Sequence, residues 1–265
     1  MNEHENITRQ HLMSETIGKA TLHNIDCMEY MKSLLDNSFD LIVTSPPYNM
    51  RTRVRNGEYT TREKSNHFSK KYSNFDDALT IDEYFTFHSN AINEMLRLSK
   101  IIIYNIQIVT GSKEALFKII GLFHKEIKDI AIWDKGHGQP SMHDGVLNKA
   151  TELILILEPN AKAGRCFNTY NFERGTLSDI WRIKREQSEV EGHSASFPIK
   201  FAETAILNFS KINDKVFDPF MGTGTTGVAS LNHNREFYGC ELDKDYYEAS
   251  IKRITQAAAQ ERLFA

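Results

Sequence analysis

The sequence of 265 residues is 40% hydrophobic and 25% charged, with 14 Gly and 6 Pro, which is close to the average of globular proteins. This length and composition exclude a disordered chain and a mini-protein that depends on disulfides or metals for its core. The formal charge of −3 gives the chain as a whole no nucleic-acid-binding signature, so any such role must be local.

The cysteine spacing and the N-terminal residues indicate in which cellular compartment the protein is expected. Cys27, Cys166 and Cys240 are widely separated and lack C-x-x-C spacing, which argues against a disulfide framework or a zinc knuckle. The first residues are polar and include acids, unlike a signal peptide, and no apolar run approaches the ~20 residues of a membrane span. We expect a cytoplasmic protein with no membrane contact and no metal site.

Short apolar runs that end in polar or turn residues are the clearest pattern along the chain, and helix-like stretches lie between them. Runs of this kind are typical of strands buried on both faces. The predicted strands are 39–44, 101–108, 127–133, 153–157, 215–218 and 237–241, and the predicted helices are 26–35, 81–99, 114–124, 199–209 and 246–261. The alternation predicts one α/β domain over residues 1–265, with a doubly wound, mostly parallel sheet and inserted loops.

Two segments do not fit this alternation. Residues 51–71 hold seven Lys or Arg against two Glu, and we expect a mobile basic loop there. Residues 160–193 interleave aromatic with basic side chains, a composition that suits either nucleic-acid recognition or a surface excursion with a small aromatic anchor.

A glycine-rich motif follows the strand predicted at 215–218. In VFDPFMGTGTTG, the residues Gly222, Gly224 and Gly227 form G-x-G-x-x-G between a strand and a helix, where the backbone can approach a ligand. Glu241, at the end of the next strand, could accept hydrogen bonds from ribose hydroxyls. No Lys and Ser or Thr follow the last glycine, which excludes a P-loop, and Asp218 would favour a ligand with a positive charge. S-adenosylmethionine meets these conditions, and glycine spacing alone leaves a nicotinamide cofactor open.

A second motif ends the first buried strand. In DLIVTSPPYNM, Pro46 and Pro47 fix the backbone and leave rigid carbonyl groups after Ser45 and before the ring of Tyr48. The Ser45 oxygen and the Pro46 carbonyl could accept the two N–H bonds of a planar amine, with Tyr48 stacked on its face. A strand-ending turn with a core tyrosine is the alternative.

Together the two motifs resemble the signature pair of bacterial and phage DNA amino-methyltransferases, which methylate N6 of adenine or N4 of cytosine. The catalytic motif comes first, as in the β group of these enzymes. Residues 22–30 (LHNIDCMEY), 132–135 (IWDK) and 193–202 (HSASFPIKFA) also resemble family segments, so the likeness extends from about 22 to 253.

The resemblance implies a Rossmann-like methyltransferase fold and a role for each matching residue. It implies S-adenosylmethionine as the cofactor and Ser45, Pro46, Pro47 and Tyr48 as the catalytic residues. The implied cofactor-binding residues are Asp26, His193, Phe197, Pro198, Asp218, Pro219, Phe220, Gly222, Gly224, Thr225, Thr226 and Glu241. The expected phosphate contacts come from the basic loop, through Arg51, Arg53, Arg55, Lys70 and Lys71, and residues 160–193 occupy the family's target-recognition position.

The resemblance also implies partners and a reaction. The substrate would be double-stranded DNA, a cognate restriction endonuclease and a homodimer are possible, and the target base would be flipped out of the duplex. Ser45 resembles the form common among N4-cytosine enzymes, so cytosine is favoured over adenine. An RNA base methyltransferase, a nicotinamide-dependent oxidoreductase and a catalytically idle nucleic-acid-binding module remain as alternatives.

Overall fold

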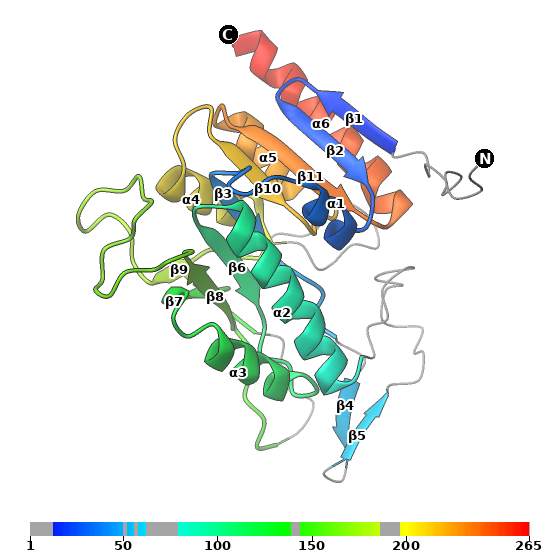
Figure 1. The fold of residues 1–265 in the computed structure, drawn as a ribbon, viewed down its shortest axis with the longest axis vertical. Helices are drawn as coiled ribbons and strands as arrows, with labels where there is room; N and C mark the ends of the chain where they lie inside the picture. Colours follow the sequence, from blue (N-terminus) through cyan, green and yellow to red (C-terminus); the bar gives the residue numbers. More distant parts are fainter. Residues whose placement is uncertain are drawn as a thin grey trace, which may run out of the picture.

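The computed structural model describes residues 13–49, 52–55, 58–61, 79–138, 144–185 and 197–264, and these form a twisted central sheet with helices on both sides (Figure 1). The sheet has nine strands in the order β1-β2-β11-β10-β3-β6-β8-β7-β9, and β4 and β5 pair separately. The strands are β1 (Met13–Ile17), β2 (Ala20–Asn24), β3 (Leu41–Thr44), β4 (Thr52–Arg55), β5 (Glu58–Thr61), β6 (Ile102–Ile106), β7 (Ile127–Asp134), β8 (Thr151–Leu157), β9 (Ile180–Arg182), β10 (Lys215–Asp218) and β11 (Glu236–Glu241).

Helices cover both faces of the sheet, which confirms the doubly wound α/β prediction. The helices are α1 (Cys27–Ser33), α2 (Ile81–Leu98), α3 (Lys113–Leu122), α4 (Ile199–Phe209), α5 (Thr225–Asn232) and α6 (Lys244–Phe264). Side chains of α1, α2 and α3 share one core cluster, whereas those of α4, α5 and α6 lie in two clusters on the other face. Because helices cover both faces of the sheet, the central strands are buried on both sides, which explains why their apolar runs are continuous.

The pairing of strands is mostly parallel. Strands β2, β11, β10, β3 and β6 are consecutive in the sheet and run parallel to one another. Strand β8 is antiparallel to both β6 and β7, β1 is antiparallel to β2, and β9 is parallel to β7. Strand β10 therefore lies directly beside β3, and the two strands that carry the sequence motifs end at the same edge of the sheet.

The strand order reverses at this pair. From β3 the chain continues through α2 to β6 on one side, and from β10 it continues through α5 to β11 on the other. In doubly wound sheets such a switch point is where ligands bind, at the carboxyl ends of the strands. The fold thus brings together two motifs that are far apart in the sequence.

The structure corrects the expectation for residues 51–71 in part. Instead of a loop throughout, β4 and β5 form an antiparallel hairpin in register Thr52↔Thr61 to Arg55↔Glu58. Thr, Val and Tyr in TRVR and EYTT favour strands, but each sequence is too short and too polar to stand out from the charged residues around it. Arg53 and Arg55 lie in β4, whereas Arg51, Lys70 and Lys71 lie outside the described residues.

Other elements were not expected. The hairpin of β1 and β2 turns at Gly18, which has a left-handed φ of 58°, and its first strand is too exposed to give an apolar run. Strand β9 lies within 160–193, where Trp181 is buried between exposed neighbours, so this segment extends the sheet edge before it leaves the described residues at 186. No helix in the described part of the chain is both long and apolar enough to span a membrane.

Candidate active site

Two threonine hydroxyl groups and one aspartate carboxyl group connect β3 with β10, the two strands that precede the motifs. Thr44 Oγ1, at the end of β3, donates to Asp218 Oδ1 over 2.7 Å, and Thr226 Oγ1, at the start of α5, donates to Asp218 Oδ2 over 2.7 Å. The backbone N–H of Phe220 also donates to Asp218 Oδ1. Asp218 therefore connects β3, β10 and α5 at the switch point of the sheet.

The position of Asp218 corrects one expectation. The sequence suggested a carboxylate that faces the ligand, but the side chain is only 2% exposed and accepts three hydrogen bonds from the protein itself. Burial raises the pKa of Asp218 to about 6, although the three donors oppose this shift. Its charge would act from beneath the glycine loop rather than by direct contact.

The glycine loop has the backbone conformation that its sequence predicts. Gly222 and Gly224 have φ values of 52° and 80°, which side chains rarely tolerate, and Gly224 is the N-cap of α5. A Cβ on Gly227 would lie 2.6 Å from Ile254 of α6 and 2.8 Å from Phe237 of β11. The third glycine thus lets α5 pack closely on its neighbours, which is the role that the third glycine has in dinucleotide-binding loops.

Arg253 of α6 holds the glycine loop in place through hydrogen bonds to two of its threonines. Its guanidinium donates to the carbonyl of Thr223 over 2.9 Å and to the hydroxyl groups of Thr223 and Thr225. Nothing in the sequence near Arg253 marked this role, because the contact depends on how α6 packs against α5.

Glu241 lies at the carboxyl end of β11, beside the glycine loop. Its Oε2 accepts from the N–H of Gly222 over 2.9 Å and its Oε1 from the N–H of Asp243 over 2.8 Å. Burial raises the pKa of Glu241 to about 7, against the lowering effect of these two bonds. Each oxygen keeps acceptor capacity for a ligand hydroxyl.

The remaining predicted cofactor residues fall around this edge or outside the described chain. Asp26 follows β2 and caps α1 by accepting from the N–H groups of Met28 and Glu29. Phe197 and Pro198 are buried at the start of α4, on the opposite face of the sheet from α1. Pro219 is buried, Phe220 is half-buried, and His193 lies outside the described residues.

The turn after β3 is held on several sides. Tyr84 of α2 donates its hydroxyl to the carbonyl of Pro47 over 3.1 Å. Asn49, fully buried with a left-handed φ of 55°, exchanges two hydrogen bonds of 2.8 Å with the backbone of Leu79, just before α2. These contacts at Pro47 and Asn49 hold the turn of residues 45–49 in one position against α2.

A buried polar cluster behind the turn was missed by sequence reasoning. Ser45 Oγ lies 2.7 Å from the Tyr48 hydroxyl, which donates to Glu152 Oε2 over 2.9 Å. Asn105 Nδ2 donates to both the Tyr48 oxygen and Glu152 Oε2, and Lys135 Nζ donates to Glu152 Oε1 over 3.0 Å. Lys135 and Glu152 are 7% and 9% exposed. The sequence signals were Lys135, at the end of the IWDK segment, and Glu152, an acid near the start of the apolar strand TELILIL.

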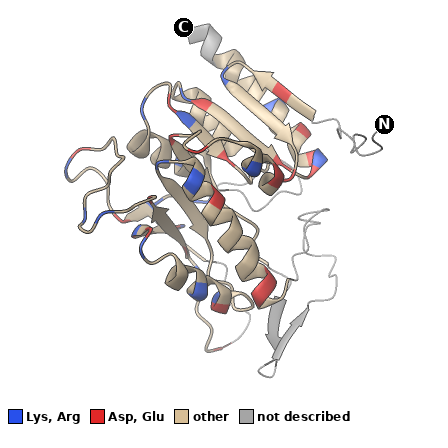
Figure 2. Ribbon diagram, viewed as in Figure 1, with Lys and Arg blue, Asp and Glu red and all other residues tan. Residues whose placement is uncertain are grey.

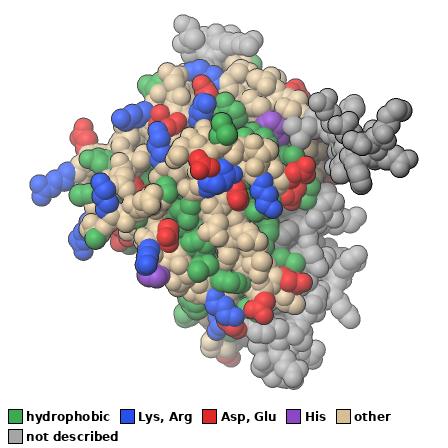
Figure 3. Space-filling view, viewed as in Figure 1, with side chains coloured by type: hydrophobic (Ala, Val, Ile, Leu, Met, Phe, Trp, Pro, Cys, Tyr) green, Lys and Arg blue, Asp and Glu red, His purple; other side chains and the backbone are tan. Residues whose placement is uncertain are grey.

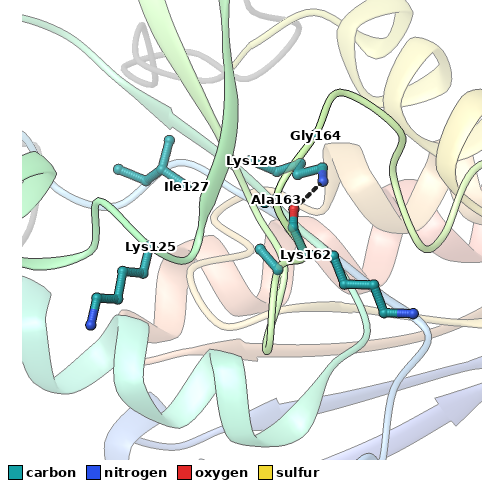
Figure 4. A pocket seen from close by; sticks show the side chains of 7 residues that line it. Lys125, Ile127, Lys128, Lys162, Ala163 and Gly164 are labelled. Carbon is teal, nitrogen blue, oxygen red and sulfur yellow. Dashed lines mark hydrogen bonds between the residues drawn. The ribbon is translucent and has the colours of Figure 1, made fainter.

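A surface pocket of about 400 Å³ lies elsewhere, lined by Lys125, Ile127, Lys128, Ala161, Lys162, Ala163 and Gly164 (Figure 4). Lys128 Nζ donates to the carbonyl of Lys162 over 2.7 Å. Ile127 pairs with Leu157, which also pairs with Ile102 at the start of β6. The pocket therefore lies at the sheet edge opposite to the motifs.

Basic and acidic residues are scattered along the ribbon in Figure 2, and their side chains are interspersed on the face that Figure 3 shows. The described part of this face therefore gives no uniform basic field, in agreement with the small net charge of the chain.

Comparison with known proteins identifies the family. The DNA methylase family of N6 and N4 methyltransferases matches residues 39–252, most of the chain. The chain belongs to this family. The region matched contains both motifs and the strands that bring them together. Membership excludes the nicotinamide-dependent oxidoreductase that glycine spacing alone allowed.

Relatives of this DNA methylase span most of its length. It is 26% identical to the type II methyltransferase M.BglII of Bacillus subtilis over 88% of this chain and 68% of that protein. It is 29% identical to the type II methyltransferase M.HinfI of Haemophilus influenzae over 92% of this chain and 71% of that protein.

Solved structures confirm the methyltransferase fold. The cytosine-N4-specific PvuII DNA methyltransferase superposes with a TM-score of 0.68, at 17% identity over 93% of each chain. The M1.HpyAVI–SAM complex superposes with a TM-score of 0.57, at 20% identity over 88% of this chain and 99% of that chain.

Proposed function

We propose that this DNA methylase transfers a methyl group from S-adenosylmethionine to the exocyclic amine of a flipped base in double-stranded DNA, with N4 of cytosine favoured over N6 of adenine. The observation that carries the proposal is the rigid turn of Ser45 to Tyr48, which lies beside the glycine loop through the Thr44–Asp218 hydrogen bond. The names of its relatives, type II methyltransferases, support a place in a restriction–modification system.

The chain's own residues fit the cofactor. The left-handed Gly222 and Gly224 allow close approach to the loop, Glu241 offers carboxylate oxygens for ribose hydroxyls, and Asp218 and Asp26 supply negative charge nearby. When bound, the cofactor supplies an activated methyl group on a positively charged sulfur. Carboxylates around the loop would stabilise that charge and would repel a pyrophosphate.

The turn fits the second substrate. The lone pair of an exocyclic amine is delocalised into the base ring, which makes the nitrogen a poor nucleophile. Two acceptors on its N–H groups, Ser45 Oγ and the Pro46 carbonyl, would draw the nitrogen toward tetrahedral geometry and stabilise the positive charge that develops on it. Burial raises the pKa of both Cys27 and Cys240, so neither thiol is activated as a nucleophile, in keeping with direct transfer.

Base specificity and DNA contacts extend the proposal. Ser45 in place of an acidic residue supports cytosine, Tyr48 would contact the flipped base, and β4 with the basic residues around it would contact phosphates. Residues 160–193 would read bases in the major groove.

Product analysis tests the function. Purified protein is incubated with labelled S-adenosylmethionine and unmethylated duplex DNA of varied sequence, and the nucleosides are analysed by mass. We expect N4-methylcytosine, and loss of transfer in Ser45→Ala with cofactor affinity retained. N6-methyladenine would overturn the choice of base, and transfer to RNA alone would overturn the choice of nucleic acid. Cofactor binding without transfer to either would identify a catalytically idle module.

A further inference from the structure

Behind the proposed catalytic turn, the cluster of Lys135, Glu152, Asn105 and Tyr48 fixes which way hydroxyl hydrogens point. Glu152 is paired with the Lys135 ammonium at 3.0 Å, so it is a carboxylate and can only accept hydrogen bonds. The Tyr48 hydroxyl therefore donates its single hydrogen to Glu152. It follows that Ser45 is the donor in the 2.7 Å contact with Tyr48, since the tyrosine hydrogen is already used.

Asn105 adds a second constraint on the same series of hydrogen bonds. Its Nδ2 donates to Glu152 Oε2 over 2.7 Å and to the Tyr48 oxygen over 2.8 Å. The opposite orientation of the amide would place Oδ1 against the carboxylate, which fixes the assignment. In this orientation Asn105 Oδ1 is buried without a hydrogen-bond partner among the described residues, which is unfavourable. The hydrogen bond from Asn105 Nδ2 to the Glu152 carboxylate offsets this loss.

These directions have a consequence for Ser45. A serine hydroxyl can both donate and accept, and a hydrogen pointed at the substrate would repel an amine. With its hydrogen committed to Tyr48, Ser45 Oγ can present only lone pairs to a group on its open side. The hydroxyl thus behaves as the pure acceptor that a carboxylate would be.

We propose that Glu152 is a positioning residue which, held by Lys135, orders the hydroxyl groups of Tyr48 and Ser45 so that Ser45 accepts a hydrogen bond from the target amine. The inference rests on the proposed function, because it gives Ser45 its role through the amine substrate. Glu152 does not touch the base; it acts through Tyr48.

Glu152→Gln reverses the chain of donors. The amide N–H₂ can donate to Tyr48, whose hydrogen is then free to donate to Ser45, and the Ser45 hydrogen turns to the substrate. We expect kcat for methyl transfer to fall by at least about tenfold, the worth of one charge-assisted hydrogen bond, with the Kd for S-adenosylmethionine unchanged.

Glu158→Gln is the matched control. Glu158 is fully buried, accepts from the backbone N–H groups of Asn168 and Thr169, and follows the end of β8 that lies away from the motifs. Its substitution removes a carboxylate that is equally buried and hydrogen-bonded but lies away from the motifs, and we expect kcat to stay at the wild-type value. Equal kcat values for Glu152→Gln and Glu158→Gln would overturn the proposal.

A double-mutant cycle separates positioning from general structural support. Tyr48→Phe removes the hydroxyl that links Glu152 to Ser45, so it should lower kcat by itself, and adding Glu152→Gln should lower kcat little further. Additive losses would overturn the proposal, because a structural role of Glu152 does not depend on the Tyr48 oxygen. If Glu152→Gln fails to fold, Lys135→Met combined with Glu152→Gln removes the unpaired ammonium and is measured instead.

Wild type and Ser45→Ala in the same assay distinguish this inference from the proposed function. Without transfer by wild type, the proposed function fails and the inference falls with it. With full transfer by Ser45→Ala, methyl transfer stands, but the acceptor role of Ser45 fails and the inference is overturned. With an active wild type, an inactive Ser45→Ala and a fully active Glu152→Gln, only the inference is overturned.

Discussion

At the scale of single residues, the buried carboxyl group of Glu241 links cofactor binding to pH. Its pKa in the folded protein is about 7, above the ordinary value of 4.5, because burial disfavours the charged form. Ionisation as the pH rises through 7 therefore costs stability in the cofactor-free protein. A ligand with positive charge and hydroxyl donors would stabilise the ionised form.

We accordingly expect S-adenosylmethionine to bind more weakly at low pH. Above pH 7 the affinity should be constant, and between pH 7 and 6 the Kd should rise by up to about tenfold per pH unit, since one proton must leave Glu241; below pH 6 protonation of Asp218 should add to the rise. Calorimetric titrations between about pH 5.5 and 8 would measure this. Glu241→Gln should bind weakly with a flatter pH profile, and a wild-type Kd independent of pH would contradict the assignment.

At the scale of elements, the Thr44–Asp218 bond joins β3 to β10 across a separation of 174 residues. Thr44→Val keeps the side-chain shape but leaves a buried carboxylate oxygen with one donor fewer. We expect the free energy of unfolding to fall by about 1–3 kcal/mol, measured by urea denaturation. Thr204→Val, which removes an exposed 2.7 Å bond to Lys200 within α4, should change it by less than about 0.5 kcal/mol.

The sequence was informative about elements wherever burial on both faces produced apolar runs. It predicted β3, β6, β7, β8, β10 and β11. It missed β9 and both hairpins because none of their strands carries an apolar run: β1 is exposed, β2 mixes apolar with polar residues, and β4 contains two Arg. It also missed the contacts of Glu152, Asn105 and Arg253, since these depend on which side chains meet after β6, β8 and α6 have packed.

At the scale of the whole molecule, charge is unevenly distributed along the chain. Residues 51–71 carry a net +5, which leaves −8 for the remainder, and Arg53 and Arg55 lie in β4. We expect duplex binding to depend on salt chiefly through this segment. Arg53→Gln and Arg55→Gln should each lower the slope of log K against log salt by about 0.9, as measured by fluorescence anisotropy.

Lys125→Gln with Lys162→Gln is the matched control for charge, because both lysines line the pocket at the opposite edge of the sheet. The double substitution removes two positive charges away from the motifs and should leave the salt slope unchanged. An equal loss of slope in both pairs of variants would indicate that net charge, rather than the β4 segment, governs binding.

The pairing of β3 with β10 also governs when the enzyme can first act. At a synthesis rate of about 5–20 residues per second, the 174 residues between Thr44 and Asp218 take about 9–35 s to be made. During that interval the nascent chain contains the Ser45 turn but not the glycine loop, and the edge of β3 that later pairs with β10 has no partner strand. We therefore expect nascent chains that end before Asp218 to be inactive, and the unpaired edge of β3 to be a site of aggregation in such chains.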